Sequence, residues 1–262
     1  MSTLLEVRGL TVEFSGQRAL RAVDAVDLRV AAGERLAIVG ESGCGKTQLL
    51  LACTGLLAAN GRAQGSVRFE GRELLGEPEA VGAARGRDIG FVFQDAGGSL
   101  TPHRRIGDQL VEVAELTLGL SRDQARREAA AALERAGLPD ARSRLAQYPH
   151  ELSGGMRQRA AIALALVARP KLLFADEPTT ALDVTVQAGI LELIESLCRD
   201  SGMSLLLVTH DLGVVAALAD RIAVMQSGRI VESATAAEFM RGPKEAYSRS
   251  LLESVLTLEG VA

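Results

Sequence analysis

The chain has 262 residues, of which 47% are hydrophobic and 24% are charged, enough to bury a substantial core. Because α/β domains of this size often fold as one unit, we expect a single domain over residues 1–262. The formal net charge is -4 and the isoelectric point is near 5.6. This balance argues against a protein that binds nucleic acid by neutralising its phosphates, since such proteins usually carry a basic face.

We expect neither a membrane span nor an export signal in this sequence. Its longest apolar run, residues 160–168, has about half of the roughly 18 residues that a membrane helix needs. Residues 1–6 lack the basic and apolar regions of a signal peptide, so we expect a location inside the cell. The three cysteines are scattered without a C-x-x-C pair, which fits a reducing compartment and offers no metal-site spacing.

The N-terminal part of the chain has the pattern of an antiparallel sheet. Residues 4–14 and 23–30 mix apolar and polar positions, as half-exposed strands do, and Gly33 follows the second run. Further along, short and nearly continuous apolar runs indicate parallel strands that are covered on both faces. These runs are residues 35–39, 89–93, 172–175 and 204–208. Helices are expected between them, so the predicted fold class is α/β with an N-terminal antiparallel β-subdomain.

Between the second and third of these runs, helical patterns dominate over about 95–154, and we expect an inserted α-helical subdomain there. Ser121-Arg-Asp-Gln124 is typical of a capping box that begins a helix. That helix should run through Arg135, with Gly137 as its C-terminal cap.

The chain then returns to the core. Residues 222–225 and 229–231 flank Ser227-Gly228, a pattern that predicts a hairpin. The core is expected over about 1–94 and 155–232, followed by a helix-prone C-terminal tail over about 233–262.

A glycine-rich loop follows the run over 35–39 and opens a predicted helix over 46–57, which is the context that a phosphate-binding loop requires. Glycines let consecutive N–H groups converge on phosphates, and the helix N-terminus adds its positive end. Lys46 would reach the outer phosphates, and the Thr47 hydroxyl can hold Mg2+. Lysine is scarce in this chain, occurring at positions 46, 171 and 244 only. The loop comprises Gly40, Glu41, Ser42, Gly43, Cys44, Gly45, Lys46 and Thr47.

Two adjacent acids follow the apolar run over 172–175, at the carboxyl end of a strand, where open parallel sheets bind their ligands. Asp176 would hold Mg2+ through water, and Glu177 would polarise the water that attacks the γ-phosphate. Acids at strand ends are commonly solvated loop residues. The glycine loop upstream favours the catalytic interpretation over that alternative.

Ser153, Gly154 and Gly155 precede residues 156–168, a run suited to a helix, with Ser153 as its N-cap. By itself this pattern indicates only a helix start. A helix N-terminus with adjacent glycines and a hydroxyl is also a second phosphate site, and one domain cannot readily use two on a single triphosphate. Two copies that face each other could use both.

In this order, the residues resemble those of the ATP-binding-cassette (ABC) ATPases, a P-loop NTPase family, over nearly the whole chain. Residues 40–47 are similar to the Walker A loop, residues 173–177 to the Walker B strand with its catalytic acid, and residues 152–158 to the LSGGxxQ signature. The resemblance further implies a Q-loop glutamine at Gln94, a D-loop at Ala181-Leu-Asp183, a switch histidine at His210 and an adenine-stacking aromatic at Phe14.

The resemblance implies a head-to-tail dimer that binds ATP with Mg2+ and hydrolyses the ATP. The implied catalytic residues are Lys46, Gln94, Glu177 and His210, and the implied Mg2+ ligands are Thr47, Gln94 and Asp176. The implied nucleotide contacts are Phe14, the whole loop from Gly40 to Thr47, Gln94, Asp176, Ser153, Gly154, Gly155 and Asp183. Ser153 and its glycines would contact the ATP that the partner subunit's loop holds.

Within the family, the chain most resembles the ATPases of the peptide and nickel importer group. The similarity to this group lies in residues 93–102, 148–156 and 179–187. In this group two different ATPases often pair, one with SGGM and one with SGGQ, and Met156 suggests the first kind; a homodimer is the alternative. The resemblance implies two membrane permease subunits that dock on about 95–110, an extracytoplasmic substrate-binding protein as an indirect partner, and no nucleic acid. It places the chain peripherally at the cytoplasmic face of the inner membrane.

Several alternatives stay open. The core motifs do not encode direction, so the chain could serve an exporter, and the cargo could be a peptide, nickel or a metal chelate. A non-transport ABC ATPase that acts on nucleic acid would normally carry a coiled coil or zinc modules, for which the insertion is too short. A regulatory cassette that binds ATP without cleaving it would lack catalytic residues, whereas Lys46, Glu177 and His210 are all present.

Overall fold

The structure is a computed structural model and describes residues 2–16, 19–180 and 182–259. Its contacts divide the chain into two compact units. The first unit comprises Met1–Gly82 and Ser204–Ala262, and the second comprises Ala83–Met203. The division expected from the sequence, with a helical subdomain over about 95–154, was based on helical sequence patterns and not on contacts. It therefore stays a prediction.

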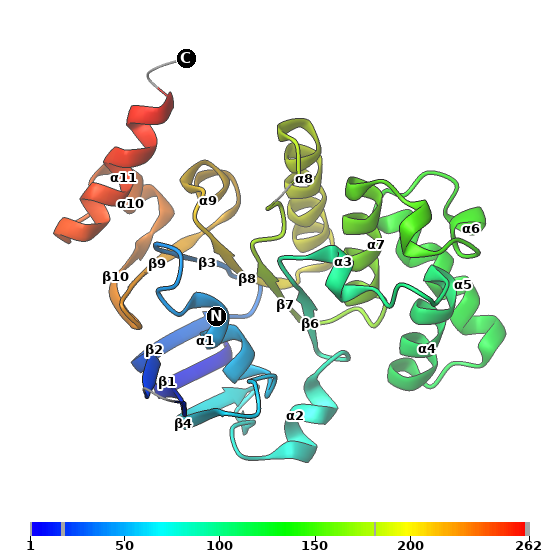
Figure 1. The fold of residues 1–262 in the computed structure, drawn as a ribbon, viewed down its shortest axis with the longest axis horizontal. Coiled ribbons are helices and arrows are strands. Elements are labelled where there is room, and N and C mark those ends of the chain that lie inside the picture. The colour runs from blue at the N-terminus through cyan, green and yellow to red at the C-terminus, as the bar shows by residue number, and fades with distance from the viewer. Residues whose placement is uncertain (1, 17–18, 181, 260–262) are drawn as a thin grey trace. The chain divides into compact units, whose positions relative to one another are not determined.

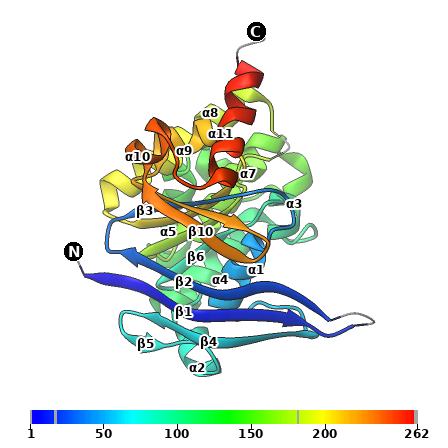
Figure 2. The same cartoon turned by 90° about the vertical axis from the view of Figure 1, so that its left-hand side faces the viewer.

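The first unit contains the expected antiparallel sheet. Strand β1 (Thr3–Phe14) lies between β2 (Leu20–Ala31) and β4 (Gly61–Phe69), and β5 (Arg72–Glu73) continues the sheet beyond β4 (Figure 2). Alternate side chains of β1 are buried, as the mixed polar and apolar pattern predicted. β4 and β5 were not predicted.

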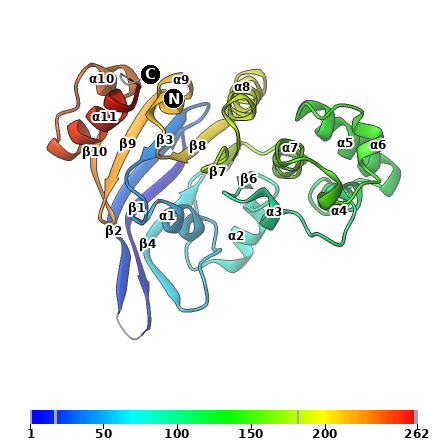
Figure 3. The ribbon, with the colours of Figure 1, turned by 45° about the horizontal axis from the view of Figure 1, so that its top comes forward.

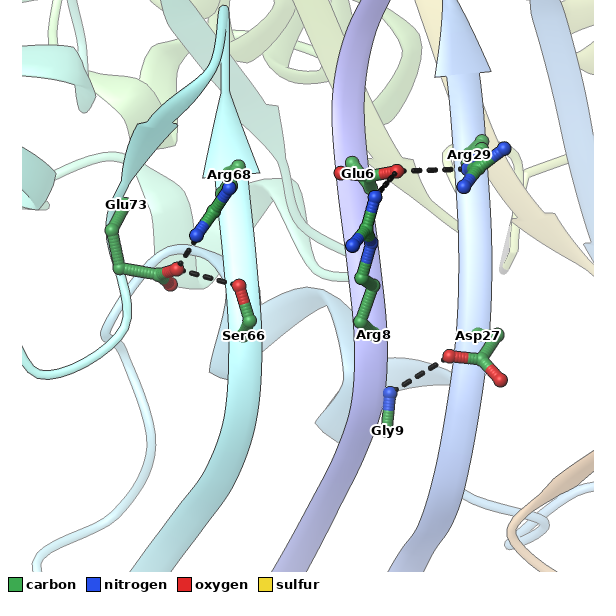
Figure 4. A network of polar contacts seen from close by, with 8 residues as sticks. All are labelled: Glu6, Arg8, Gly9, Asp27, Arg29, Ser66, Arg68 and Glu73. Carbon is green, nitrogen blue, oxygen red and sulfur yellow. Dashed lines mark hydrogen bonds and ion pairs between the residues drawn. The ribbon is translucent and has the colours of Figure 1, made fainter.

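The outer face of this sheet carries paired charges. Glu6 Oε1 lies 2.9 Å from Arg8 Nη2 and 2.9 Å from Arg29 Nε (Figure 4). On β4, Arg68 Nε lies 3.3 Å from Glu73 Oε2. Each of these arginines thus lies beside a carboxylate.

A bulge in β1 sets the register of its two sides. The register with β2 shifts between Val7 and Leu10, and Gly9 takes a φ of 54° at this point. The Gly9 N–H donates to Asp27 Oδ1 over 2.8 Å, which satisfies the amide that leaves the ladder (Figure 4).

A second set of strands in the first unit is parallel. Strand β3 (Arg35–Val39) pairs in parallel with both β8 (Ser204–Thr209) and β9 (Arg221–Gln226). The predicted hairpin is confirmed, because β10 (Arg229–Thr235) pairs antiparallel with β9 across Ser227 and Gly228 (Figure 3). The continuous apolar runs are buried on both faces, as parallel strands require.

Helices of the first unit follow these strands. They are α1 (Lys46–Cys53), α9 (Leu212–Leu218), α10 (Ala236–Arg241) and α11 (Ala246–Glu259), and α2 (Pro78–Ala84) lies where the chain passes into the second unit. The predicted end of α1 at Leu57 is wrong. Gly55 takes a φ of 65° and its N–H bonds to the Ala52 carbonyl, so the chain leaves the helix there.

The second unit combines a parallel strand pair with helices. Strand β6 (Ile89–Val92) pairs with β7 (Leu172–Asp176). The helices are α3 (Ala96–Ser99), α4 (Ile106–Leu118), α5 (Arg122–Arg135), α6 (Ala141–Arg144), the 3-10 helix η1 (Pro149–Glu151), α7 (Gly154–Leu166) and α8 (Val184–Ser201) (Figure 1). The capping box of α5 is confirmed, since Gln124 Oε1 accepts from the Ser121 N–H over 3.0 Å.

None of the helices formed by the described residues combines the length and the apolar character that a membrane crossing requires.

Candidate nucleotide site

The phosphate loop of the first unit lies between β3 and α1, where the sequence placed it. Two of its glycines lie against neighbouring backbone. A Cβ atom at Gly40 would be 2.1 Å from the Met225 carbonyl oxygen, and one at Gly45 would be 2.1 Å from the Ala22 carbonyl oxygen. Only glycine fits at these two positions, and the φ of 106° at Gly45 also favours it.

Lys46 is buried, and its ammonium group bonds to the loop itself. Nζ donates to the Gly40 carbonyl over 2.7 Å and to the Glu41 carbonyl over 2.9 Å, and lies 3.8 Å from Cys44 Sγ. These neutral partners do not balance the positive charge of a side chain that is only 5% exposed. An anionic ligand is therefore the natural partner of this ammonium group.

The residues in the first half of the loop are open to solvent. Glu41, Ser42 and Gly43 are exposed, and no heavy atom lies within 4 Å of a Cβ built on Gly43. Thr47 lies half-buried in the first turn of α1, where its hydroxyl adjoins the helix N-terminus.

The first unit holds two more predicted site residues. Phe14 ends β1, and its ring packs over Gly61, where a Cβ would lie 2.8 Å from Phe14 Cε1. His210 follows β8 and is exposed. The next residue, Asp211, caps α9 by accepting from the Gly213 N–H over 2.8 Å.

The two acids of the second unit lie at the end of β7, as predicted from the sequence. Asp176 is 3% exposed, while Glu177 is half-buried and takes a φ of 45°. Positive φ is rare and unfavourable for a residue with a long side chain. Glu177 Oε2 accepts from Gln94 Nε2 over 3.0 Å and from Thr180 Oγ1 over 2.9 Å. Gln94 and Glu177, which lie far apart in the sequence, are thus brought together.

The serine and glycines of the second unit open α7. Ser153 is exposed and caps the helix, with its Oγ accepting from the Met156 N–H over 3.3 Å. A Cβ at Gly154 would lie 3.9 Å from Leu182 Cδ2, an ordinary contact, whereas a Cβ at Gly155 would lie 2.8 Å from Val186 Cγ1 of α8. Glycine at position 155 therefore lets α7 approach α8 closely.

Asp183 begins α8 as its N-cap, with Oδ1 accepting from the Val186 N–H over 3.0 Å. The predicted nucleotide contact of Asp183 stays a prediction. The D-loop was predicted to begin at Ala181, which lies outside the described residues.

Two residues of this site were not singled out from the sequence as site residues. Thr180 donates to Glu177, and Gln158, which is 3% exposed, donates to the Pro178 carbonyl over 2.6 Å. Gln158 therefore connects the helix that Ser153 opens to the turn that carries Glu177. Its place as the last residue of the LSGGMRQ stretch was the available signal, whereas nothing in the sequence marked Thr180.

The residue types present fit Mg2+. Thr47, Gln94 and Asp176 supply hydroxyl, amide and carboxylate oxygens, which are the donors that Mg2+ prefers. Across residues 2–16, 19–180 and 182–259, three or more His, Cys, Asp and Glu side chains do not gather into a metal cage.

Comparison with known proteins adds a family to this geometry. Residues 23–180 match the ABC transporter family. An oligopeptide transport ATP-binding protein, OppD, of Haemophilus influenzae is 46% identical over 99% of this chain and 81% of its own length. OppD of Salmonella typhimurium is 47% identical over 98% of this chain and 78% of its own length. The oligopeptide transport ATP-binding protein AppD of Bacillus subtilis is 44% identical over 99% and 80%.

Solved structures of cassettes share the fold. A dimeric ATP-binding cassette, MJ0796, in a post-hydrolysis state bound to ADP and phosphate has a TM-score of 0.76 and 28% identity, over 89% of this chain and 99% of that one. CbiO1 from Clostridium perfringens, part of an ABC transporter complex, has a TM-score of 0.77 and 25% identity, over 100% and 98%. Motifs, fold and relatives agree, and this chain belongs to the ABC transporter family.

Proposed function

We propose that this chain hydrolyses ATP to power the uptake of peptides through separate membrane subunits. The observation that carries the proposal is the position of Glu177 at the end of β7, where Gln94 and Thr180 both donate to its Oε2. The names of the relatives, which are oligopeptide transport ATP-binding proteins, support the peptide cargo. The alternative cargo, nickel or a metal chelate, finds no support in them.

The phosphate loop supplies the binding part of the reaction. Glycines leave consecutive N–H groups free to converge on the phosphates, and the N-terminus of α1 adds its partial positive charge. Lys46 turns from the carbonyls of Gly40 and Glu41 to the phosphates, because two full negative charges outweigh two carbonyl dipoles. Phe14 provides the ring on which adenine stacks. The N–H groups of the loop can bind the phosphates without a movement of the strands and helices around the loop.

Glu177 supplies the catalytic part. Its carboxylate accepts a proton from water or orients that water towards the γ-phosphate, while Gln94 and Thr180 fix the rotamer of the side chain. Mg2+, held by the oxygens of Thr47, Gln94 and Asp176, would neutralise charge that develops on the phosphate oxygens. His210 would contact the γ-phosphate.

The working unit is a dimer with membrane partners. The exposed Ser153, at the N-terminus of α7, is available to the ATP of a second cassette, and the dimeric cassette among the structural relatives supports this arrangement. We expect a different, SGGQ-type cassette as the partner, two permease subunits that dock on about 95–110, and a substrate-binding protein outside the membrane. The chain would then lie at the cytoplasmic face of the inner membrane.

The test of catalysis compares two charge-neutralising substitutions. Glu177→Gln should lower the rate of phosphate release by at least about 100-fold, because it removes the proton acceptor and keeps the shape. With Mg-ATP, the same variant should elute as a dimer on gel filtration. Glu192→Gln, an exposed position on α8, should change neither quantity. Unchanged turnover in Glu177→Gln would refute the assigned role.

The test of transport uses the assembled complex. The chain, purified with its permease subunits in proteoliposomes, should show ATPase activity that rises when a peptide-loaded binding protein is added. Stimulation by a substrate on the cassette side alone would instead indicate an exporter, and stimulation by nickel would identify the other cargo.

A further inference from the structure

The C-terminal segment packs on the strand that leads into the phosphate loop. Phe239 of α10 is 1% exposed and belongs to a buried cluster with Ala37 and Val39 of β3. The side chains of α11 that pack against this cluster are Tyr247, Leu251 and Leu252. In two views, α10 and α11 lie beside β9 and β10 (Figures 1 and 3). Residues 236–252 are therefore part of the support of the loop.

One contact joins α11 to the loop directly. The Glu41 N–H donates to Tyr247 Oη over 3.1 Å. The carbonyl of Glu41 accepts from Lys46 Nζ over 2.9 Å and from the Cys44 N–H over 3.3 Å. The backbone of Glu41 is thus fixed from opposite sides, by the C-terminal helix through its N–H and by the loop itself through its carbonyl.

Hydrogen bonds to β10 also hold the two residues that lead into α11. Glu232 of β10 accepts from the Lys244 N–H over 2.8 Å and from the Glu245 N–H over 3.1 Å, one oxygen for each amide. Tyr247 follows within one turn and is half-buried. Burial raises the pKa of Tyr247, so its phenol stays neutral at neutral pH and does not repel phosphate.

The strand hairpin holds the loop at a second point. The Gly228 N–H, in the turn between β9 and β10, donates to the Cys44 carbonyl over 2.9 Å. These two hydrogen bonds to the loop therefore come from the chain beyond β8. When Lys46 leaves the Glu41 carbonyl for phosphate, the bond to Tyr247 remains, because it lies on the N–H side.

We propose that Tyr247 is a positioning residue of the phosphate loop, through which the C-terminal helix holds the first turn of the loop ready for ATP. This inference rests on the proposed function, since it assigns a support to the same site. A loop without this bond has more backbone freedom, and the entropy lost on ordering it is subtracted from the binding free energy. The affinity for ATP, not the chemical step, should depend on the hydroxyl.

The experiment removes the phenolic oxygen of Tyr247 and leaves the rest of the chain unchanged. Tyr247→Phe should raise the Kd for Mg-ATP, measured by isothermal titration calorimetry, by about 5-fold, the effect of one neutral hydrogen bond. In ATPase assays KM should rise while kcat stays within about two-fold, because Tyr247 contacts the loop and not the attacking water.

The chain offers a matched control, because it has two tyrosines and no tryptophan. The other tyrosine, Tyr148, lies in the second unit and stacks on His150 with ring centroids 5.6 Å apart. Tyr148→Phe should leave the Kd unchanged.

A second variant addresses the same contact from the other side. Glu232→Ala frees the start of α11 and should raise the Kd in the same direction, with the melting temperature recorded to confirm folding. A Kd within two-fold of wild type in folded Tyr247→Phe would overturn the inference. Failure of the wild-type chain to bind ATP would overturn the proposed function instead.

Discussion

At the scale of single residues, Glu177 combines an unfavourable backbone with a well-fixed side chain. Its φ of 45° costs on the order of 1–3 kcal/mol for a residue other than glycine. The hydrogen bonds from Gln94 and Thr180 hold the carboxylate in one place. Strain of this kind persists where the surrounding structure over-determines the conformation, as it does in the turn where Gln158 binds the Pro178 carbonyl.

Thr180 gives a prediction at this scale. Thr180→Val removes the donor to Glu177 Oε2 with little change of shape, and kcat for ATP should fall by about 10-fold, the effect of one hydrogen bond to a charged group. Because the Thr180 hydroxyl donates to Glu177, the residue assigned to the chemical step, KM should stay within about two-fold. Thr180→Ser keeps the hydroxyl and should restore kcat. An equal loss of kcat in both variants would mean that the bond from the hydroxyl to Glu177 does not by itself explain the role of Thr180.

The residues of the site were predictable to unequal degrees. Lys46, Asp176 and Glu177 stand in local patterns, because a loop or a strand end needs its neighbours in sequence to work. The partner of Glu177 could not be predicted from local pattern, since Gln94 is 83 residues away in the chain. Tyr247 likewise contacts Glu41 across 206 residues, and no local signal marks such a pair.

At the scale of elements, close packing between a strand and a helix fixes certain glycines. A Cβ at Gly90 of β6 would lie 2.6 Å from the Ala165 carbonyl oxygen of α7 and 3.0 Å from Pro170 Cγ. The helix that Ser153 opens therefore lies directly against β6, the strand that leads to Gln94. A change of this spacing would move the signature helix relative to Gln94 within the second unit.

A pair of glycine substitutions tests this packing. Gly90→Ala should lower the free energy of unfolding by about 1–3 kcal/mol, because the carbonyl of Ala165 is backbone and cannot move aside. Gly82→Ala is the control. Gly82 is exposed in α2, with nothing within 4 Å of a Cβ, so alanine should stabilise by about 0.5–1 kcal/mol. Urea denaturation followed by circular dichroism measures both, and equal effects would contradict the account.

The elements themselves were largely predictable where periodicity was strong. The continuous apolar runs that became β3, β7 and β8 are confirmed, because a strand buried on both faces leaves no polar position. Strand β4 was missed. It carries two arginines, two glycines, a glutamine and a serine, and its pairing with β1 stabilises an extended conformation that its own sequence does not favour.

At the scale of the whole molecule, ion pairs between arginines and carboxylates make the stability of both units depend on pH. Burial alone would raise the pKa of Asp220, but hydrogen bonds from the side chain and amide of Arg35 hold it below its usual range. Burial also acts to raise the pKa of Glu128, and Arg135 and Arg169 lower it more. Both pKa values therefore lie below those of the unfolded chain.

The sign of the pH dependence follows. A depressed folded-state pKa stabilises the fold fully above the unfolded value, about 4, and this stabilisation is lost as pH falls through the folded-state pKa. The melting temperature should therefore fall between about pH 5 and about pH 3. Asp220→Asn should make this fall shallower, at a loss within about 1 kcal/mol at neutral pH, because the pair is partly exposed. Asp200→Asn, at a side chain that is 73% exposed, should leave the slope unchanged.

The sequence by itself determined the class of fold, the chemistry of the phosphate loop and of the paired acids, and the family. These depend on short-range features, namely strand and helix periodicity and motifs whose residues are neighbours in the chain. Only the tertiary structure decided which distant side chains meet: Gln94 and Thr180 at Glu177, Gln158 at Pro178, and Tyr247 at Glu41. Such contacts form when helices and strands pack and bring residues together that are remote in the sequence. The residues on either side of each one in the sequence do not indicate which distant residue it will contact.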